Sequence, residues 1–148
     1  MYDHILVPTD GTESTRHALD IAVTLHSQLK SDTPQRKITL LHVIETIADD
    51  DAEEFERFYS TLRKRAEKKM NALTEPYHAA QDTGSFTIEP AILLGSRVQE
   101  ILAFAKENKV DLIILNSHKI DVNNPTQGWG TISHKVGILS QCPVMLVK

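Results

Sequence analysis

The sequence is short of several features that would place it in other protein classes. Its 148 residues include a single cysteine, Cys142, so the chain cannot form an internal disulfide bond and is not a disulfide scaffold. Because Cys142 precedes an apolar segment and has no acidifying neighbour, we expect a small buried side chain rather than a reactive thiol. No apolar run approaches the ~20 residues that a membrane-spanning helix needs, and the N-terminus lacks the basic start and apolar stretch of a signal peptide. We therefore expect a cytoplasmic protein without a membrane partner.

Positive charge is also scarce. The chain has 16 Lys and Arg residues against 20 Asp and Glu residues, for a net charge of −4. Such a chain has no overall positive field with which to neutralise many phosphates, so a nucleic-acid partner is disfavoured. Apolar residues make up 41% and charged residues 24%, which is typical of a globular protein, and the length suits one domain over residues 1–148.

Five short segments with many apolar and β-branched residues predict strands, at residues 4–8, 37–44, 86–94, 110–115 and 143–147, and the first two of these are expected to be buried. Helical periodicity predicts helices between them, starting at Thr12 or Ser14, at about Asp50, at Gly95-Ser96 and at about Thr131, whereas residues 76–85 are expected to be a loop. This alternation of strands and helices predicts an α/β fold, a single doubly wound domain whose five-stranded parallel sheet has helices on both faces. Pro90 cannot donate to a ladder hydrogen bond, so the third strand is expected at a sheet edge.

Two of the helices have a predicted buried stripe. In the helix from about Asp50 to Leu73 the stripe is Phe55, Phe58, Leu62, Ala66 and Leu73, and in the last helix it is Ile132, Val136 and Leu139. The basic residues from Arg63 to Lys69 are interpreted as a solvated helix face, because acidic residues lie four positions away.

Polar turns follow the first and the fourth predicted strands. In doubly wound sheets, ligands bind outside the carboxyl ends of the strands where the strand order reverses. If these two strands are neighbours, Asp10 faces the loop from Asn116 to Thr131. Neither a G-x-x-x-x-G-K-[ST] phosphate loop nor a G-x-G-x-x-G dinucleotide motif is present. Asp10 has a second interpretation, as a cap of the first helix.

Several segments, in this order and at this spacing, resemble one known family over nearly the full length. They are Ile5–Thr12, Leu41–Val43, Gly95-Ser96, Val110–His118 and Gly130-Thr131 through Val147. The family is the universal stress protein family, and the resemblance implies a homodimer and cytoplasmic expression linked to stress or growth arrest. The resemblance leaves two possibilities for nucleotide binding, because some members of the family bind ATP and others bind no nucleotide.

The members that bind ATP carry G-x-x-G, nine residues and then G-[ST]. Here the corresponding segment is Asn116-Ser-His-Lys119, followed by ten residues and Gly130-Thr131. Both early glycines are missing, although Asn116 is a residue that adopts the left-handed region readily. Gly130-Thr131 keeps the free amides of a helix N-terminus, which suit phosphate. The side chain of Lys119 could either crowd the phosphates or supply a charge to them.

The resemblance implies a nucleotide site, with Mg²⁺ bound only together with ATP. Its implied residues are Pro8, Thr9, Asp10 and Val43 around adenine and ribose, Leu115 and Ile132 in the walls, and Asn116, Lys119, Gly130 and Thr131 toward the phosphates. No catalytic constellation or metal-ligand spacing is identified, and slow hydrolysis of bound ATP stays open. Trp129 either stacks on a base or packs the loop.

Three hypotheses follow. The first is a nucleotide-responsive regulatory module of the stress response, and the second is a nucleotide-free member acting through its homodimer and protein partners. The third, an enzyme of the wider α/β nucleotide-using class, is disfavoured because Thr9-Asp-Gly-Thr12 is a poor pyrophosphate loop. The last strand, Pro143–Val147, is the expected dimer contact, since an apolar edge strand needs to be paired or covered.

Overall fold

The computed structural model describes residues 2–28, 35–46, 52–83, 86–117, 123 and 131–148. These residues form one five-stranded parallel sheet with strand order β3-β2-β1-β4-β5. The elements are β1 (His4–Thr9), α1 (Thr15–Gln28), β2 (Arg36–Glu45), α2 (Ala52–Thr74), η1 (Glu75–Tyr77), α3 (His78–Thr83), β3 (Phe86–Gly95), α4 (Arg97–Glu107), β4 (Leu112–Asn116), α5 (Ile132–Leu139) and β5 (Val144–Val147). The predicted fold class is confirmed.

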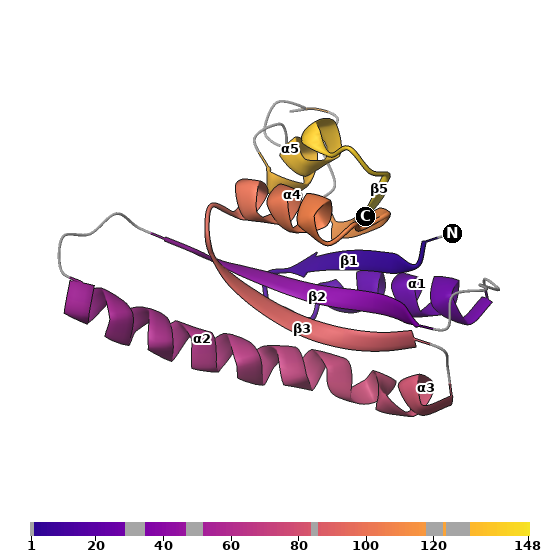
Figure 1. Ribbon diagram of the computed structural model, residues 1–148, viewed down its shortest axis with the longest axis horizontal. Helices are drawn as coiled ribbons and strands as arrows, with labels where there is room; N and C mark the ends of the chain where they lie inside the picture. Colours follow the sequence, from indigo (N-terminus) through magenta and orange to yellow (C-terminus); the bar gives the residue numbers. More distant parts are fainter. Residues whose placement is uncertain (1, 29–34, 47–51, 84–85, 118–122, 124–130) are drawn as a thin grey trace.

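Helices cover both faces of the sheet (Figure 1). Along β1, alternate side chains enter different clusters: Ile5 and Val7 pack with buried residues of α1 and α2, whereas Leu6 packs with buried residues of α4 and α5. This alternation is the two-residue period of a strand that is buried on both faces. The core therefore has two layers, and β1, at the centre of the sheet, contributes to both.

The strand order reverses between β1 and β4, which are hydrogen-bonded neighbours. Their carboxyl ends therefore lie at the same edge of the sheet, as the sequence analysis required for a crevice there. The edge position of the third strand is also confirmed, because β3 is the terminal strand on one side and its Pro90 pairs only with Leu40 of β2.

Two predictions about buried helix faces are wrong. Phe58 of α2 is 54% exposed, and the buried face of this helix consists of Tyr59, Ala66, Met70 and Leu73. Phe58 precedes Tyr59 by one position, which rotates its side chain by about 100° away from the core. In α5, Val136 is fully buried but Leu139 is 59% exposed, because the helix ends there and the chain turns toward β5.

The predicted loop over residues 76–85 is also wrong, since η1 and α3 occupy residues 75–83. Pro76 lies in the first turn of η1, where its missing amide hydrogen leaves no hydrogen bond unmade. Tyr77 is buried, donates a hydrogen bond to the carboxylate of Asp20, and lies beneath the guanidinium of Arg16 at 5.8 Å. Burial raises the pKa of Tyr77 to about 12, so this phenol is a neutral donor whose hydrogen bond connects η1 to α1.

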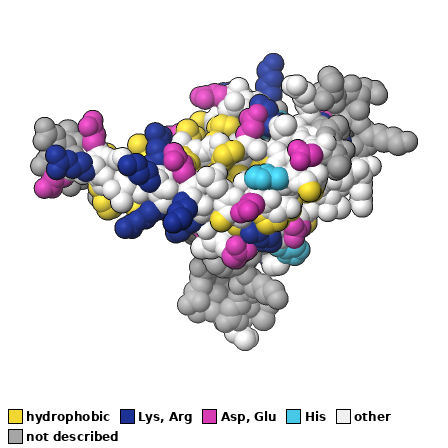
Figure 2. Space-filling view, turned by 90° about the horizontal axis from the view of Figure 1, so that it is seen from below, with side chains coloured by type: hydrophobic (Ala, Val, Ile, Leu, Met, Phe, Trp, Pro, Cys, Tyr) yellow, Lys and Arg dark blue, Asp and Glu magenta, His cyan; other side chains and the backbone are white. Residues whose placement is uncertain are grey.

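The predicted solvated face of α2 is confirmed. Its basic residues Arg63, Lys64, Arg65, Lys68 and Lys69 are all exposed. Figure 2 shows lysine and arginine side chains interspersed with acidic ones over this side of the molecule.

Candidate functional site

A cavity of about 630 Å³ opens at the carboxyl ends of β1 and β4. This is the size range of small-molecule sites, which is roughly 300–1,000 Å³. Eight of the ten predicted site residues line it: Pro8, Thr9, Asp10, Val43, Leu115, Asn116, Thr131 and Ile132. The other two, Lys119 and Gly130, lie outside the described residues, as does Trp129.

The turn after β1 holds Asp10 at the cavity. The Thr9 hydroxyl accepts a hydrogen bond from the amide of Gly11 at 2.9 Å and lies 2.6 Å from the hydroxyl of Thr15. The Oδ1 atom of Asp10 accepts from the amide of Thr12 at 2.9 Å and from its hydroxyl at 2.6 Å. Because α1 begins only at Thr15, Asp10 closes this turn and does not cap the helix, so the capping interpretation is wrong.

The carboxylate of Asp10 is held in its ionised form. Burial by itself would raise its pKa, but the two hydrogen bonds from Thr12 and the nearby positive charge of Arg97 lower the pKa below its ordinary value. Within the described part of the chain, no hydrogen bond reaches its second oxygen, Oδ2. Asp10 therefore offers an acceptor to a hydroxyl or amino group of a ligand.

The walls between the two polar ends are apolar. Leu41 and Val43 come from β2, Leu115 from β4, Ile101 from α4 and Ile132 from α5. Four of these side chains are buried, and Ile132 is half-buried. A flat, largely apolar group such as a purine base would gain free energy by leaving water for this surface.

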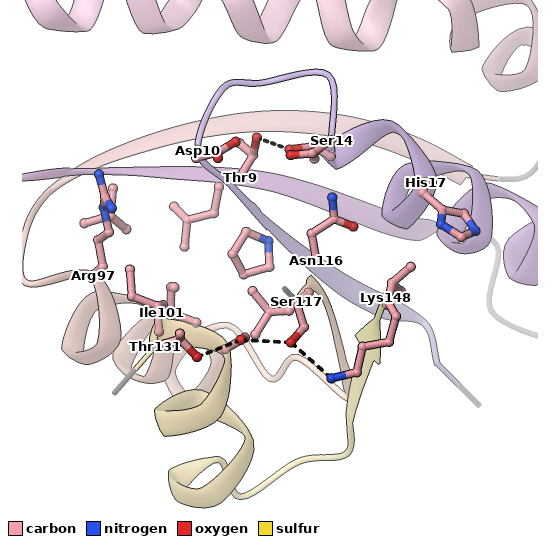
Figure 3. A pocket seen from close by; sticks show the side chains of 18 residues that line it. Thr9, Asp10, Ser14, His17, Arg97, Ile101, Asn116, Ser117, Thr131 and Lys148 are labelled. Atoms are coloured by element: carbon pink, nitrogen blue, oxygen red, sulfur yellow. Dashed lines mark hydrogen bonds between the residues drawn. The ribbon is translucent and has the colours of Figure 1, made fainter. Parts of the chain in front are cut away.

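The N-terminus of α5 forms the other polar end. Thr131 is its N-cap residue, and its hydroxyl accepts from the amide of His134 at 3.4 Å. The buried Ser133 hydroxyl lies 3.2 Å from that of Thr131 and donates to Ser117 at 3.3 Å, and Lys148 Nζ donates to Ser117 at 3.5 Å. Figure 3 shows this chain of hydroxyl groups ending at the lysine. Amides and hydroxyls at a helix N-terminus, with an ammonium beside them, suit an anionic group.

Sequence reasoning missed the cationic and imidazole side chains of the cavity, which are Arg97, His17 and Lys148. Lys148 follows β5, and Val147 of β5 pairs with Asn116 of β4. Lys148 therefore reaches the carboxyl end of β4 only because β4 and β5 are neighbours in the sheet. Arg97 is the first residue of α4, and its guanidinium lies 3.8 Å from Glu45. Both Arg97 and Glu45 are exposed, so this pair contributes little to stability.

Arg97 could have been found from the Gly95-Ser96 turn that precedes it. Gly95 has a backbone φ of +149°, which favours glycine, and a Cβ there would lie 2.6 Å from Oε1 of Glu100, so the Glu100 side chain would have to move. A glycine at the end of a strand indicates a tight turn into a helix, and it places the next side chains at the carboxyl end of the sheet.

Metal binding and membrane insertion are two other kinds of function that the described residues bear on. No group of three or more His, Cys, Asp or Glu side chains that could hold a metal ion occurs among them. In this same part of the chain, no helix is long and apolar enough to cross a membrane.

Comparison with known proteins points to one family. The family model described as the universal stress protein family matches residues 1–148. The universal stress protein YxiE of Bacillus subtilis is 30% identical over 155 residues, and the alignment covers 100% of both chains. The universal stress protein MJ0577 of Methanocaldococcus jannaschii is 30% identical over 165 residues, which cover 100% of this chain and 96% of that protein.

Solved structures share the fold. The universal stress protein UspA from Lactobacillus plantarum has a TM-score of 0.74 at 21% identity, covering 99% of this chain and 98% of that one. Two others have TM-scores of 0.59. One is a universal stress protein in complex with cAMP, at 20% identity with 98% and 95% of the chains covered. The other is a universal stress protein family protein from Arabidopsis thaliana with AMP bound, at 19% identity with 98% and 90% covered.

Proposed function

The chain belongs to the universal stress protein family, and we propose that it is a cytoplasmic, nucleotide-responsive binding protein of the stress response. The ligand proposed is an adenine nucleotide, ATP in the first instance, in the cavity at the carboxyl ends of β1 and β4. The single observation that carries the proposal is the order of chemistry along this cavity: a carboxylate, apolar walls, and then hydroxyls and amides at a helix N-terminus.

In this proposal each part of the nucleotide meets a complementary group. The base lies between Val43, Leu115 and Ile132, and Asp10 accepts a hydrogen bond from the ribose or the base. The phosphates lie at the N-terminus of α5, where the Thr131 hydroxyl and the ammonium of Lys148 face them. Lys148 would thereby supply charge at a site whose loop lacks two of the glycines expected of ATP-binding members. Mg²⁺ is proposed only as a companion of the triphosphate. The two relatives of the same fold that carry cAMP or AMP support the nucleotide class.

The direct test is ATP binding, measured by calorimetry and by ATP-dependent melting of the purified protein. Asp10→Asn keeps the shape of the side chain and removes its charge, so it should weaken binding by about tenfold or more, the range for one charge-assisted hydrogen bond. Asp82→Asn, at an exposed position of α3, is the matched control and should bind as the wild type does. A protein that is purified without nucleotide and melts at the same temperature with and without ATP would defeat the proposal.

A second candidate is a nucleotide-free member that acts through its homodimer and protein partners. The observation that favours it lies in the sequence, where Asn116 and Lys119 stand in place of glycines and the spacer has ten residues. Under this candidate, Asn116→Gly combined with Lys119→Gly should create ATP binding that the wild type lacks. ATP binding by the wild type at the same level as by the double variant would reject it.

A further inference from the structure

A second cavity, of about 410 Å³, lies on the face of the sheet covered by α4 and α5. It runs between the C-terminal half of α4 and the turn from α5 to β5, and it shares no lining residue with the first cavity. Its floor is apolar: Ala105 and Val110 are buried, and Leu102 and Cys142 are half-buried and pack against the same hydrophobic cluster. Leu139 is 59% exposed and forms part of the wall.

Two lysines, Lys106 and Lys109, are the charged residues of this lining. Both are exposed, and within the described part of the chain no carboxylate pairs with either ammonium group. The hydroxyl of Ser140, also in the lining, is already used, since it donates to the carbonyl of Cys142 at 3.0 Å and accepts from its amide at 3.2 Å. The polar side-chain groups left for a ligand are therefore the two ammonium groups and the exposed amide of Gln141.

The backbone of Lys109 is the unusual feature of this cavity. The amide of Lys109 donates to the carbonyl of Lys106, and the amide of Val110 donates to the carbonyl of Ala105 at 2.9 Å. These two hydrogen bonds form a Schellman motif at the end of α4, in which the residue at position 109 adopts the left-handed conformation, with φ of 54°. Glycine is the usual residue there, because a side chain with a Cβ is strained in this conformation.

A lysine at position 109 therefore makes the folded protein less stable than a glycine at this position would. What it adds is a second cationic side chain in the lining of this cavity, three positions after Lys106. A residue other than glycine is uncommon in this conformation, which makes Lys109 a starting point for a hypothesis about its side chain.

We propose that this cavity binds a small amphipathic carboxylate, whose aliphatic chain covers the floor and whose carboxylate lies between Lys106 and Lys109. The end of α4 is the negative end of its helix dipole, so the attraction for an anion comes from the lysines alone. The site is distinct from the proposed nucleotide site, because the two cavities have no lining residue in common.

The probe is octanoate, measured by calorimetry on the full chain without nucleotide, with octanol and octylamine as probes of the same chain length. Octanoate should bind at least about tenfold more tightly than either, since both lack the negative charge. Equal binding of the three probes would mean that the lysines do not select the ligand, and it would overturn the proposal, as would a complete lack of octanoate binding.

Two variants separate binding from folding. Lys109→Gly should weaken octanoate binding by about tenfold, while its thermal midpoint stays the same or rises because the strain is relieved. Lys106→Gln should weaken binding similarly, and Lys64→Gln on the exposed face of α2 is the control with the same loss of charge. Unchanged octanoate affinity in Lys109→Gly would contradict the proposal.

The location is checked by amide chemical shifts. Octanoate should perturb the amides of Val110 and Cys142, whereas ATP should perturb those of Leu115 and Ile132. Octanoate shifts confined to Leu115 and Ile132 would place the ligand in the first cavity and would overturn the assignment.

Discussion

Gly11 shows how one residue determines the turn that presents Asp10. Its φ is +85°, in the region that residues with a Cβ rarely adopt, and a Cβ there would lie 3.3 Å from Cδ of Lys69. The Lys69 side chain is flexible and exposed, so the contact can relax, but the backbone conformation cannot. Glycine is therefore required at position 11 because of the positive φ of the turn, and not because a Cβ would collide with Lys69.

Gly11→Ala is expected to lower the free energy of unfolding by about 1–2 kcal/mol, the cost of a left-handed residue with a Cβ. Gly137→Ala is the matched comparison: it lies inside α5 with nothing within 4 Å of the added Cβ, and it should raise stability by about 0.5–1 kcal/mol. Urea unfolding monitored by circular dichroism measures both. If Gly11→Ala is as stable as the wild type, the turn does not need a positive φ.

Among the elements, α5 links the two cavities. Its first residues, Ile132 and Ser133, line the first cavity, and its last residue, Leu139, lines the second. Between them, the fully buried Val136 attaches the helix to the sheet. This helix has only eight residues, and a helix this short is marginal by itself, so its position depends on its packing, of which Val136 is the fully buried apolar contact.

Val136→Ala is accordingly expected to lower the free energy of unfolding by roughly 2–3 kcal/mol, whereas Leu139→Ala should cost less than about 0.5 kcal/mol. The two changes remove aliphatic groups from the same helix, and they differ in whether those groups are buried. Denaturant unfolding of both variants gives the comparison. A large loss of stability in Leu139→Ala would show that the solvent-exposed placement of this side chain is wrong.

At the scale of the whole molecule, the sheet has two edges of different character. β3 forms one edge and carries Pro90, which cannot donate, whereas β5 forms the other and has only four residues. Met145 of β5 is 37% exposed and Ile138 of α5 is 75% exposed, so large apolar side chains reach solvent on this side. We expect β5 to be the homodimer contact, because an edge strand with apolar side chains tends to pair with another chain.

Met145→Lys is therefore expected to convert a dimer into a monomer at micromolar concentration, measured by sedimentation velocity. Val147 is a poor position for this test, because it is buried and a charge there would damage the fold. Thr87→Lys, at an exposed position of the opposite edge strand, is the control and should stay dimeric. If the wild type and Met145→Lys both sediment as dimers, β5 is excluded as the contact.

The local sequence pattern predicted the structure correctly where backbone geometry and burial allow only one arrangement. The alternation of strands and helices and the edge position of Pro90 follow from backbone hydrogen bonding and burial, and the structure confirms both. Local pattern was misleading at Phe58, at Leu139 and over residues 76–83, where hydrophobicity or a proline gave a signal that the packing of the helices overrode.

The sequence by itself determined the fold class, the turn that carries Asp10 and the N-cap Thr131, because each depends on residues adjacent in the chain. Only the tertiary structure decided that Arg97 and Lys148 share a cavity with them, and that Lys106 and Lys109 border an apolar one. The physical reason is that parallel strands are joined through helices, so residues at the same edge of a sheet come from distant parts of the chain. Their neighbours are set by the strand order β3-β2-β1-β4-β5, which no local pattern encodes.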